Sequence, residues 1–140
     1  MGKQENIKAS ERFGEAINSA QLAPFREIVA PTFVDHDPAP GQEPGPDGLI
    51  MFHETLRAAF PDLSIAVEQM IADEDNVAIA YTISGTHDGQ FMGIPPTRRP
   101  VKARGMQIAR FQNGQMVERW GSSDVLGIMQ QIGAFPSPPG

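Results

Sequence analysis

Residues 101–122 read VKARGMQIARFQNGQMVERWGS, and this stretch indicates the fold class more strongly than any other. Two runs of alternating side chains flank Asn113-Gly114, the residue pair most typical of a two-residue type I′ hairpin turn. The pattern therefore predicts antiparallel strands over 101–111 and 115–122, joined by a tight turn.

The register counted back from the turn divides the side chains of this hairpin between two faces, because directly paired residues share a face. Gln107 is expected opposite Trp120. One face then carries small and polar residues around a tryptophan: Ala103, Gly105, Gln107, Ala109, Glu118, Trp120 and Ser122, with Asp124 next if the strand continues. The other carries Arg104, Met106, Ile108, Arg110, Val117 and Arg119. The first face is the predicted wall of a ligand pocket, although a slip of one residue would exchange the two faces.

The chain before the hairpin begins with helical patterns. Apolar residues recur at helical spacing over 4–20, 22–33 and 48–60, which predicts three helices. The segment 37–48 is rich in proline and glycine and predicts a loop, either the rim of a pocket or a plain surface connection.

The pattern changes from helical to alternating after residue 61. Strands are predicted over 63–72 and 77–86, with a short strand over 90–92. A short helix is expected over 125–132, and the tail from 135 onward is expected to be loose.

Helices followed by a run of antiparallel strands predict an α+β fold. We expect a curved antiparallel sheet wrapped around the three N-terminal helices, which makes a cone with an internal pocket. A length of 140 residues fits one domain, 1–140, with an ordered core of about 5–133.

The composition argues against several classes of partner. The net charge of −6, from 17 acidic and 11 basic residues, disfavours nucleic acid and anionic membrane surfaces. The chain has no cysteine, which excludes thiolate metal sites and cysteine nucleophiles. No apolar run is long enough to span a membrane, and the first residues do not resemble a secretory signal peptide. A cytoplasmic protein is therefore expected.

The sequence has no phosphate-binding glycine loop and no nucleophile elbow. His36 lies between two aspartates and could take part in a metal site. Only His53 and His87 could join it, and both lie on other elements, so no metal site is predicted.

The histidines have structural as well as functional interpretations. His53 lies on the apolar stripe of the third predicted helix, where it is either a hydrogen-bonded core residue or, if the stripe faces a cavity, a donor to a ligand. His36 stands at the mouth of the proline-rich loop. His87 ends a strand at a turn, where surface exposure is expected.

Asp124 also has two interpretations. It directly precedes a predicted helix, where aspartate is a favoured N-cap. Alternatively, its carboxylate points into the cavity beside Trp120, where apolar surroundings would raise its pKa toward a range useful for acid–base catalysis.

Several stretches in order resemble the SnoaL-like polyketide cyclase (ester cyclase) family, within the NTF2-like superfamily of α+β cones. The resemblance extends over roughly residues 10–133 and rests on these segments: Phe33-Val-Asp-His-Asp37, Leu56-Arg-Ala-Ala-Phe-Pro-Asp-Leu63, Gly85-Thr-His-Asp-Gly-Gln-Phe-Met-Gly93 with Pro96-Thr97, and Arg110-Phe-Gln-Asn-Gly-Gln-Met-Val-Glu-Arg-Trp120 followed by Asp124.

The resemblance implies a cofactor-independent enzyme that closes a ring of an aromatic polyketide ester or ketone by intramolecular aldol condensation. The family's single acid–base aspartate matches Asp124. Gln107, His53 and Ser122 are the candidates for hydrogen bonds to the developing oxyanion. The other candidates for substrate binding are Trp120, His36 and His87.

Two further function classes remain open beside the cyclase. One is a different acid–base reaction on the same cone, by a lyase, an isomerase or a hydroxylase component. The other is a non-catalytic protein that binds a small hydrophobic ligand. In each case we expect a homodimer formed through the outer face of the sheet, because the side chains around Met106 and Ile108 are apolar enough to need cover.

Overall fold

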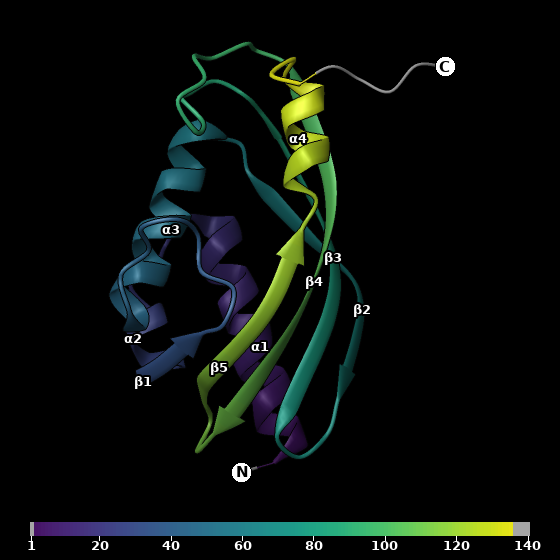
Figure 1. Ribbon diagram of the computed structural model, residues 1–140. Helices are drawn as coiled ribbons and strands as arrows, with labels where there is room; N and C mark the ends of the chain where they lie inside the picture. Colours follow the sequence, from purple (N-terminus) through teal and green to yellow (C-terminus); the bar gives the residue numbers. More distant parts are fainter. Residues whose placement is uncertain (1, 136–140) are drawn as a thin grey trace.

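A curved sheet of five strands is the centre of the computed structural model, which describes residues 2–135 (Figure 1). The strands are β1 (Val29–Asp35), β2 (Ser64–Ala72), β3 (Asn76–Thr86), β4 (Pro100–Gln112) and β5 (Gln115–Ser123). The helices are α1 (Lys3–Ser19), α2 (Phe25–Ile28), α3 (Gly45–Ala59) and α4 (Val125–Gln131). The predicted α+β class is confirmed. The prediction of a loose tail falls mostly on residues 136–140, which lie outside the described residues.

The strand order is β1-β5-β4-β3-β2. Strand β1 is parallel to β5, and all other neighbours are antiparallel. Helices α1 and α3 lie on one side of the sheet, which we call the inner face, and α4 follows β5 at its end (Figure 1). The inner face is the buried one: along β4 the buried positions alternate from Val101 to Ala109.

Large aromatic side chains fill much of the space between the inner face and the helices. Phe13 of α1 stacks on Phe25 with ring centroids 4.5 Å apart, and Phe33 and Phe60 are also buried. Burial of each such ring stabilises the fold by about 1.5–3 kcal/mol. The core of the cone is thus occupied largely by the protein's own side chains.

The prediction of a helix over 22–33 is wrong. Only the four residues of α2 are helical, and the chain continues as β1. Pro31 explains the difference, because a proline inside a helix removes a hydrogen bond and clashes with the preceding turn. An edge strand tolerates proline, and β1 is at the edge, where Pro31 is exposed.

The predicted hairpin register is correct only next to the turn. Gln112 pairs with Gln115 and Phe111 with Met116, but Arg110 then pairs with Glu118, which leaves Val117 as an extra residue in β5. This β-bulge shifts every later pair by one position, so Gln107 lies opposite Gly121 and Ile108 opposite Trp120. The predicted faces of β5 are therefore exchanged.

Two smaller expectations also need correction. The short strand predicted over 90–92 is only an isolated bridge between Phe91 and Ile94. Helix α3 begins three residues earlier than predicted, with Pro44 at its N-cap position, and Asp47 lies in its first turn.

Glycine at position 105 allows a close approach between β4 and Tyr81. A Cβ atom built on Gly105 would lie 2.5 Å from Cζ of the Tyr81 ring. We predict that Gly105→Ala lowers the free energy of unfolding by about 2 kcal/mol, because the buried ring has to move. Urea denaturation measures this change. A matched control is Gly14→Ala in α1, because the new Cβ meets nothing within 4 Å among the described residues. This substitution should stabilise the helix by about 0.5–1 kcal/mol. Equal stability of the two variants would contradict the prediction.

The outer face of the sheet carries an apolar row across four strands. Ile71, Ala78, Ile108 and Trp120 are neighbours in direct register, and Met106 lies beside them with 68% of its surface exposed. Contiguous apolar patches on soluble proteins commonly mark interaction surfaces. Arg110 and Glu118 at the border of this outer patch form an ion pair with each other at 2.6 Å, so these two residues add no net charge that would oppose pairing with a second copy.

We expect the protein to form a dimer through the outer patch, and Met106→Glu to shift it to the monomer because two like charges then meet in an apolar interface. Sedimentation over a range of concentrations measures the change. Met51→Glu is the matched control, since Met51 is also exposed, at 58%, but lies on α3. A monomeric parent protein would contradict the expectation.

Candidate functional site

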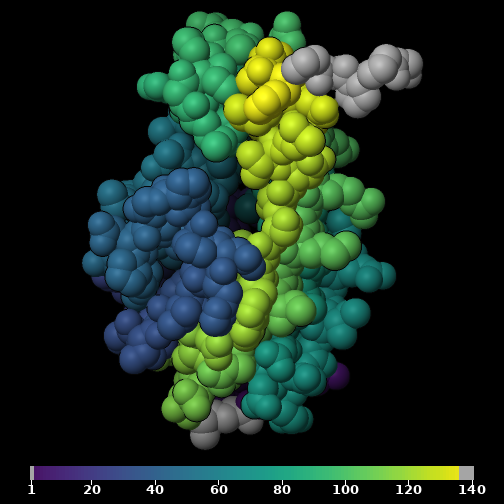
Figure 2. All heavy atoms as spheres, viewed as in Figure 1, coloured from purple at the N-terminus to yellow at the C-terminus, as the bar shows by residue number. Residues whose placement is uncertain are grey.

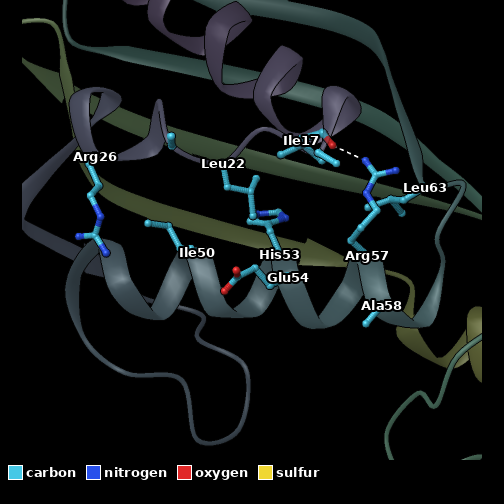
Figure 3. A pocket seen from close by; sticks show the side chains of 11 residues that line it. Ile17, Leu22, Arg26, Ile50, His53, Glu54, Arg57, Ala58 and Leu63 are labelled. Atoms are coloured by element: carbon cyan, nitrogen blue, oxygen red, sulfur yellow. Dashed lines mark hydrogen bonds between the residues drawn. The ribbon is translucent and has the colours of Figure 1, made fainter.

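A groove with a volume of about 510 Å³ runs between the turn joining α1 to α2 and one side of α3 (Figure 3). Its walls are mainly apolar, and they are formed by these residues: Ile17, Ala20, Leu22, Ala23, Ile50, Ala58 and Leu63. The charged or polar side chains that line it are Arg26, His53, Glu54 and Arg57.

Two arginine side chains make contacts at the sides of this groove. Arg26 of α2 pairs with Asp47 of α3 at 2.7 Å. Arg57 of α3 donates to the carbonyl oxygens of Ile17 and Pro61. Figure 3 shows the two arginines at opposite ends of the groove, so their contacts bridge its sides at both ends and leave the middle open.

His53 lies between these arginines and is kept neutral. Burial, followed by the positive charge of Arg119, lowers its pKa from 6.5 to about 3. Its ring contacts Phe13, Phe25 and Phe52 edge-on, with centroids 5.2–5.9 Å apart. The Nδ1 atom is shielded from solvent and has no hydrogen-bond partner among residues 2–135. Such an atom costs stability unless a ligand or water pairs with it.

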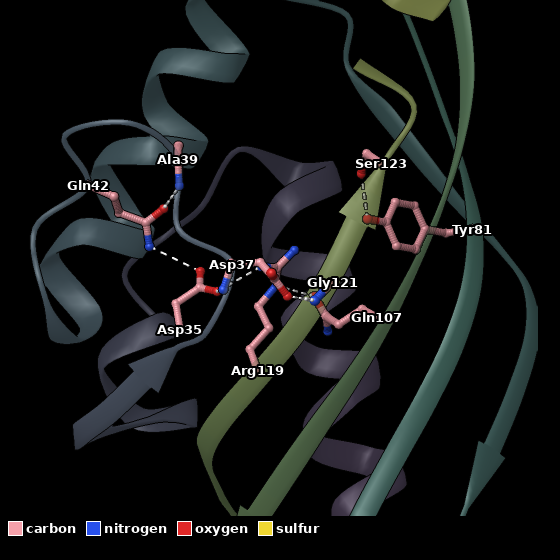
Figure 4. Close-up of polar contacts among 9 residues, drawn as sticks. All are labelled: Asp35, Asp37, Ala39, Gln42, Tyr81, Gln107, Arg119, Gly121 and Ser123. Carbon is pink, nitrogen blue, oxygen red and sulfur yellow. Dashed lines mark hydrogen bonds and ion pairs between the residues drawn. The ribbon is translucent and has the colours of Figure 1, made fainter. Parts of the chain in front are cut away.

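A network of polar side chains crosses the inner face between β1, β4 and β5 (Figure 4). Arg119 forms a 3.0 Å ion pair with Asp35, and its Nε donates to Gln107 Oε1 at 2.7 Å. Gln42 Nε2 donates to the second oxygen of Asp35 at 3.1 Å. Only 6% of the Asp35 side chain and 16% of the Arg119 side chain are exposed, so water screens this pair little.

Further polar groups lie along β5 beyond this network. Gly121 N donates to Asp37 Oδ2 at 2.9 Å, and the hydroxyls of Tyr81 and Ser123 are 2.7 Å apart. Figure 4 shows the Tyr81–Ser123 pair on the side of the sheet that faces α3. The molecular surface is hollowed between the blue segment after β1 and the yellow-green end of β5 (Figure 2).

Three of the predicted binding residues lie on the other side of β5. Because of the bulge, Trp120 and Ser122 are on the outer face and are exposed. His36 stacks on the Trp120 ring at 4.6 Å, and its Nε2 is 2.8 Å from Glu118 Oε2. Hydrogen bonds from His36 and Arg110 hold the pKa of Glu118 below its usual value. The structure therefore does not bring these residues together with Gln107, which is buried on the inner face.

The expectation that the Asp124 carboxylate is sheltered in a cavity is wrong. Asp124 is exposed, and its Oδ1 accepts a 2.8 Å hydrogen bond from Gly127 N at the start of α4. The structural interpretation, an N-cap, accounts for this geometry. An acid–base role for Asp124 remains a prediction.

His87 is fully buried, contrary to the surface position that was expected. Its Nδ1 is 2.9 Å from Thr97 Oγ1 and accepts from Thr97 N at 3.2 Å. The ring lies beside Phe60 and Phe91. These contacts tie the loop around Thr97 to the end of β3, which is a structural role.

A metal site at His36 would need two or more further ligand side chains close to it. Within the described part of the chain, no three histidine, aspartate or glutamate side chains converge on one point. None of the helices in that part is long and apolar enough to cross a membrane.

The sequence analysis missed Arg119 and Asp35, which form the charged centre of the inner face. Arg119 was assigned to the outer face because the bulge was not foreseen. The adjacent apolar residues Met116 and Val117, both buried, interrupt the alternation and are the signal that could have revealed it. Asp35 was considered only as a neighbour of His36.

Residues 7–132 match the family of SnoaL-like polyketide cyclases. The chain belongs to this family. Membership indicates an enzyme of the cyclase or isomerase type and agrees with the resemblance found in the sequence. None of the curated proteins compared with the chain is a significant match.

Solved structures share the fold of this SnoaL-like protein. IdmH from Streptomyces antibioticus, a candidate polyketide cyclase, is 30% identical with a TM-score of 0.82, over 91% of this chain and 98% of that one. AclR from Streptomyces galilaeus, a candidate hydroxylase, is 28% identical with a TM-score of 0.84, over 97% and 85%. TsrD from Streptomyces laurentii is 22% identical with a TM-score of 0.88, over 96% and 99%, which shows the common fold alone.

The low pKa of His53 predicts a specific pH dependence of stability. The unfolded chain binds a proton at His53 near pH 6.5 and the folded chain only near pH 3. Between these values the unfolded state holds more protons, so acidification destabilises the fold by up to about 1.4 kcal/mol per pH unit. The effect begins to fade at pH 6.5, where the unfolded histidine is half protonated, and is absent above about pH 7.5.

Urea denaturation at several pH values, with the parent protein and His53→Phe compared, measures this contribution. We expect the stability of the variant to fall less steeply with acidification. Parallel curves for the two proteins would show that His53 is not held neutral by the fold.

Proposed function

We propose that the protein is a cofactor-independent cyclase that closes a ring by intramolecular aldol condensation of an aromatic keto ester or diketone. The observation that carries the proposal is the polar network on the inner face, where the charged pair Arg119–Asp35 and the amide of Gln107 are held with little exposure to solvent. Buried charges are costly to fold around, and such arrangements concentrate at functional sites. Family membership supports the cyclase type of reaction.

The substrate is proposed to occupy the hollow next to the end of β5 (Figure 2). There the Tyr81–Ser123 hydroxyl pair lies above the polar network. Either hydroxyl can donate to the other, which leaves one hydrogen available for a substrate oxygen. A hydrogen bond that strengthens as the oxygen gains negative charge lowers the barrier to enolate formation.

In the proposed reaction a carboxylate removes a proton from an activated carbon next to one carbonyl group of the substrate. The carbanion attacks a second carbonyl carbon, a carbon–carbon bond forms, and the resulting alkoxide takes the proton back from the carboxylic acid. The product is therefore an isomer of the substrate. Asp124, which directly follows Ser123, is the proposed acid–base and would exchange its hydrogen bond with Gly127 for the substrate.

A non-catalytic role in binding a small hydrophobic ligand is the second candidate. It is favoured by two observations: aromatic side chains fill much of the cone, and the Asp124 carboxylate is exposed. On this alternative the buried polar groups orient a ligand without transforming it.

Asp124→Asn separates the two roles of this residue, because asparagine caps a helix about as well as aspartate but cannot take up a proton. We expect the variant to keep its melting temperature and its substrate affinity, and to lose turnover by about 100-fold or more. The assay follows an aromatic keto ester by chromatography and mass spectrometry, with a product of unchanged mass as the signature of ring closure.

Asp124→Ala is the control for capping, since it removes both functions and should also lower stability by about 1 kcal/mol. Full turnover by Asp124→Asn would exclude the acid–base role. An uncyclised product that has lost the mass of water would instead identify a lyase. Binding without any turnover by the parent protein would favour the non-catalytic alternative.

A further inference from the structure

The groove between α3 and the α1–α2 turn is separate from the hollow at the end of β5. It is lined by helical and turn residues up to Leu63, whereas the hollow lies beside β5 (Figures 2 and 3). Its volume of about 510 Å³ lies within the range of pockets that hold small organic ligands. Apolar side chains such as Leu22 and Ile50 provide most of its lining.

The charges around the groove are already balanced. Arg26 is paired with Asp47, and both ends of the Arg57 guanidinium donate to main-chain oxygens. Glu54 adds one negative charge at the rim. An ionic ligand would have to break these contacts or approach a like charge, so the groove favours an uncharged molecule.

One polar atom of a lining residue has no hydrogen-bond partner among the described residues. Three phenylalanine rings hold the His53 imidazole edge-on in a fixed orientation. In the part of the chain that the structure describes, Nδ1 of this ring is shielded and finds no hydrogen-bond partner. A fixed, neutral imidazole with an unpaired nitrogen is a specific attachment point for a hydroxyl group that reaches it from the groove, because a hydroxyl can either donate or accept.

We propose that this groove is a binding site for an uncharged aromatic alcohol whose ring lies against Leu22 and Ile50 and whose hydroxyl pairs with His53. The inference concerns binding alone and does not depend on the aldol reaction or on Asp124. It also gives a physical reason for a polar residue at a position where three phenylalanines pack around it.

The test uses two aromatic compounds that differ only in the polar group, 2-naphthol and 2-methylnaphthalene, with affinities measured by fluorescence titration. His53→Phe fills a similar space without a polar atom. We expect this variant to bind 2-naphthol about fivefold or more weakly, while its affinity for 2-methylnaphthalene changes by less than about twofold. It should also melt about 4 °C higher, because an unpaired buried polar atom is removed.

Ala58→Trp locates the binding site, since Ala58 is exposed on α3 and lines the groove away from the sheet. Its indole should block both compounds, whereas Asp124→Asn should bind both like the parent protein. The proposal is overturned if the parent protein binds neither compound, if His53→Phe binds 2-naphthol unchanged, or if Ala58→Trp binds both compounds unchanged. A failure of ring closure with these binding results intact would affect the proposed function only.

Discussion

The extra residue in β5 is the constraint on which the inner face depends. Val117 shifts the pairing with β4 by one position, and this shift turns Arg119 toward the helices and Trp120 away from them. Arg119 can then reach Asp35 on the parallel strand β1 and Gln107 on β4 at the same time. A regular hairpin would place the arginine in solvent and leave Asp35 buried without its counter-charge, which typically costs about 3–5 kcal/mol.

The fold class could be predicted from the sequence because the decisive signals are local. The Asn113-Gly114 turn and the change from helical to alternating periodicity depend only on neighbouring residues. The candidate site was harder to predict, because it depends on where distant segments meet. Pro31 favours a strand only once an edge position exists beside β5, and the bulge buries both Met116 and Val117, which a regular strand would place on opposite faces. Gln107 and His53 were identified correctly as inward-facing. The alternation of side chains is regular along β4, and the helical spacing is regular along α3.

Asp124 illustrates why a local motif alone does not define a site. The sequence allowed an N-cap or a cavity carboxylate, and both interpretations assume a helix that starts at the next residue. The difference lies in the direction of one side chain, which is set by the amide of Gly127. In contrast, the carboxylate of Asp35 is positioned by three donors, namely Arg119 on β5 and two groups of the loop after β1, the Gln42 side chain and the Asp37 amide. Multiple constraints of this kind give the rigid geometry that substrate positioning requires.

His53 connects the groove on the helical side with the network on the inner face. Arg119 is near enough to disfavour a second positive charge on the imidazole, and the surrounding phenylalanines exclude the water that would stabilise such a charge. If His53 became a cation it would compete with Arg119 for Asp35, the one carboxylate whose attraction opposes the lowering of its pKa. Neutrality of the histidine therefore preserves the Asp35–Arg119 pair. A neutral imidazole can also pack inside the aromatic cluster without a counter-charge. His53 therefore contributes to the packing of α3 and adds no positive charge beside Arg119 on β5.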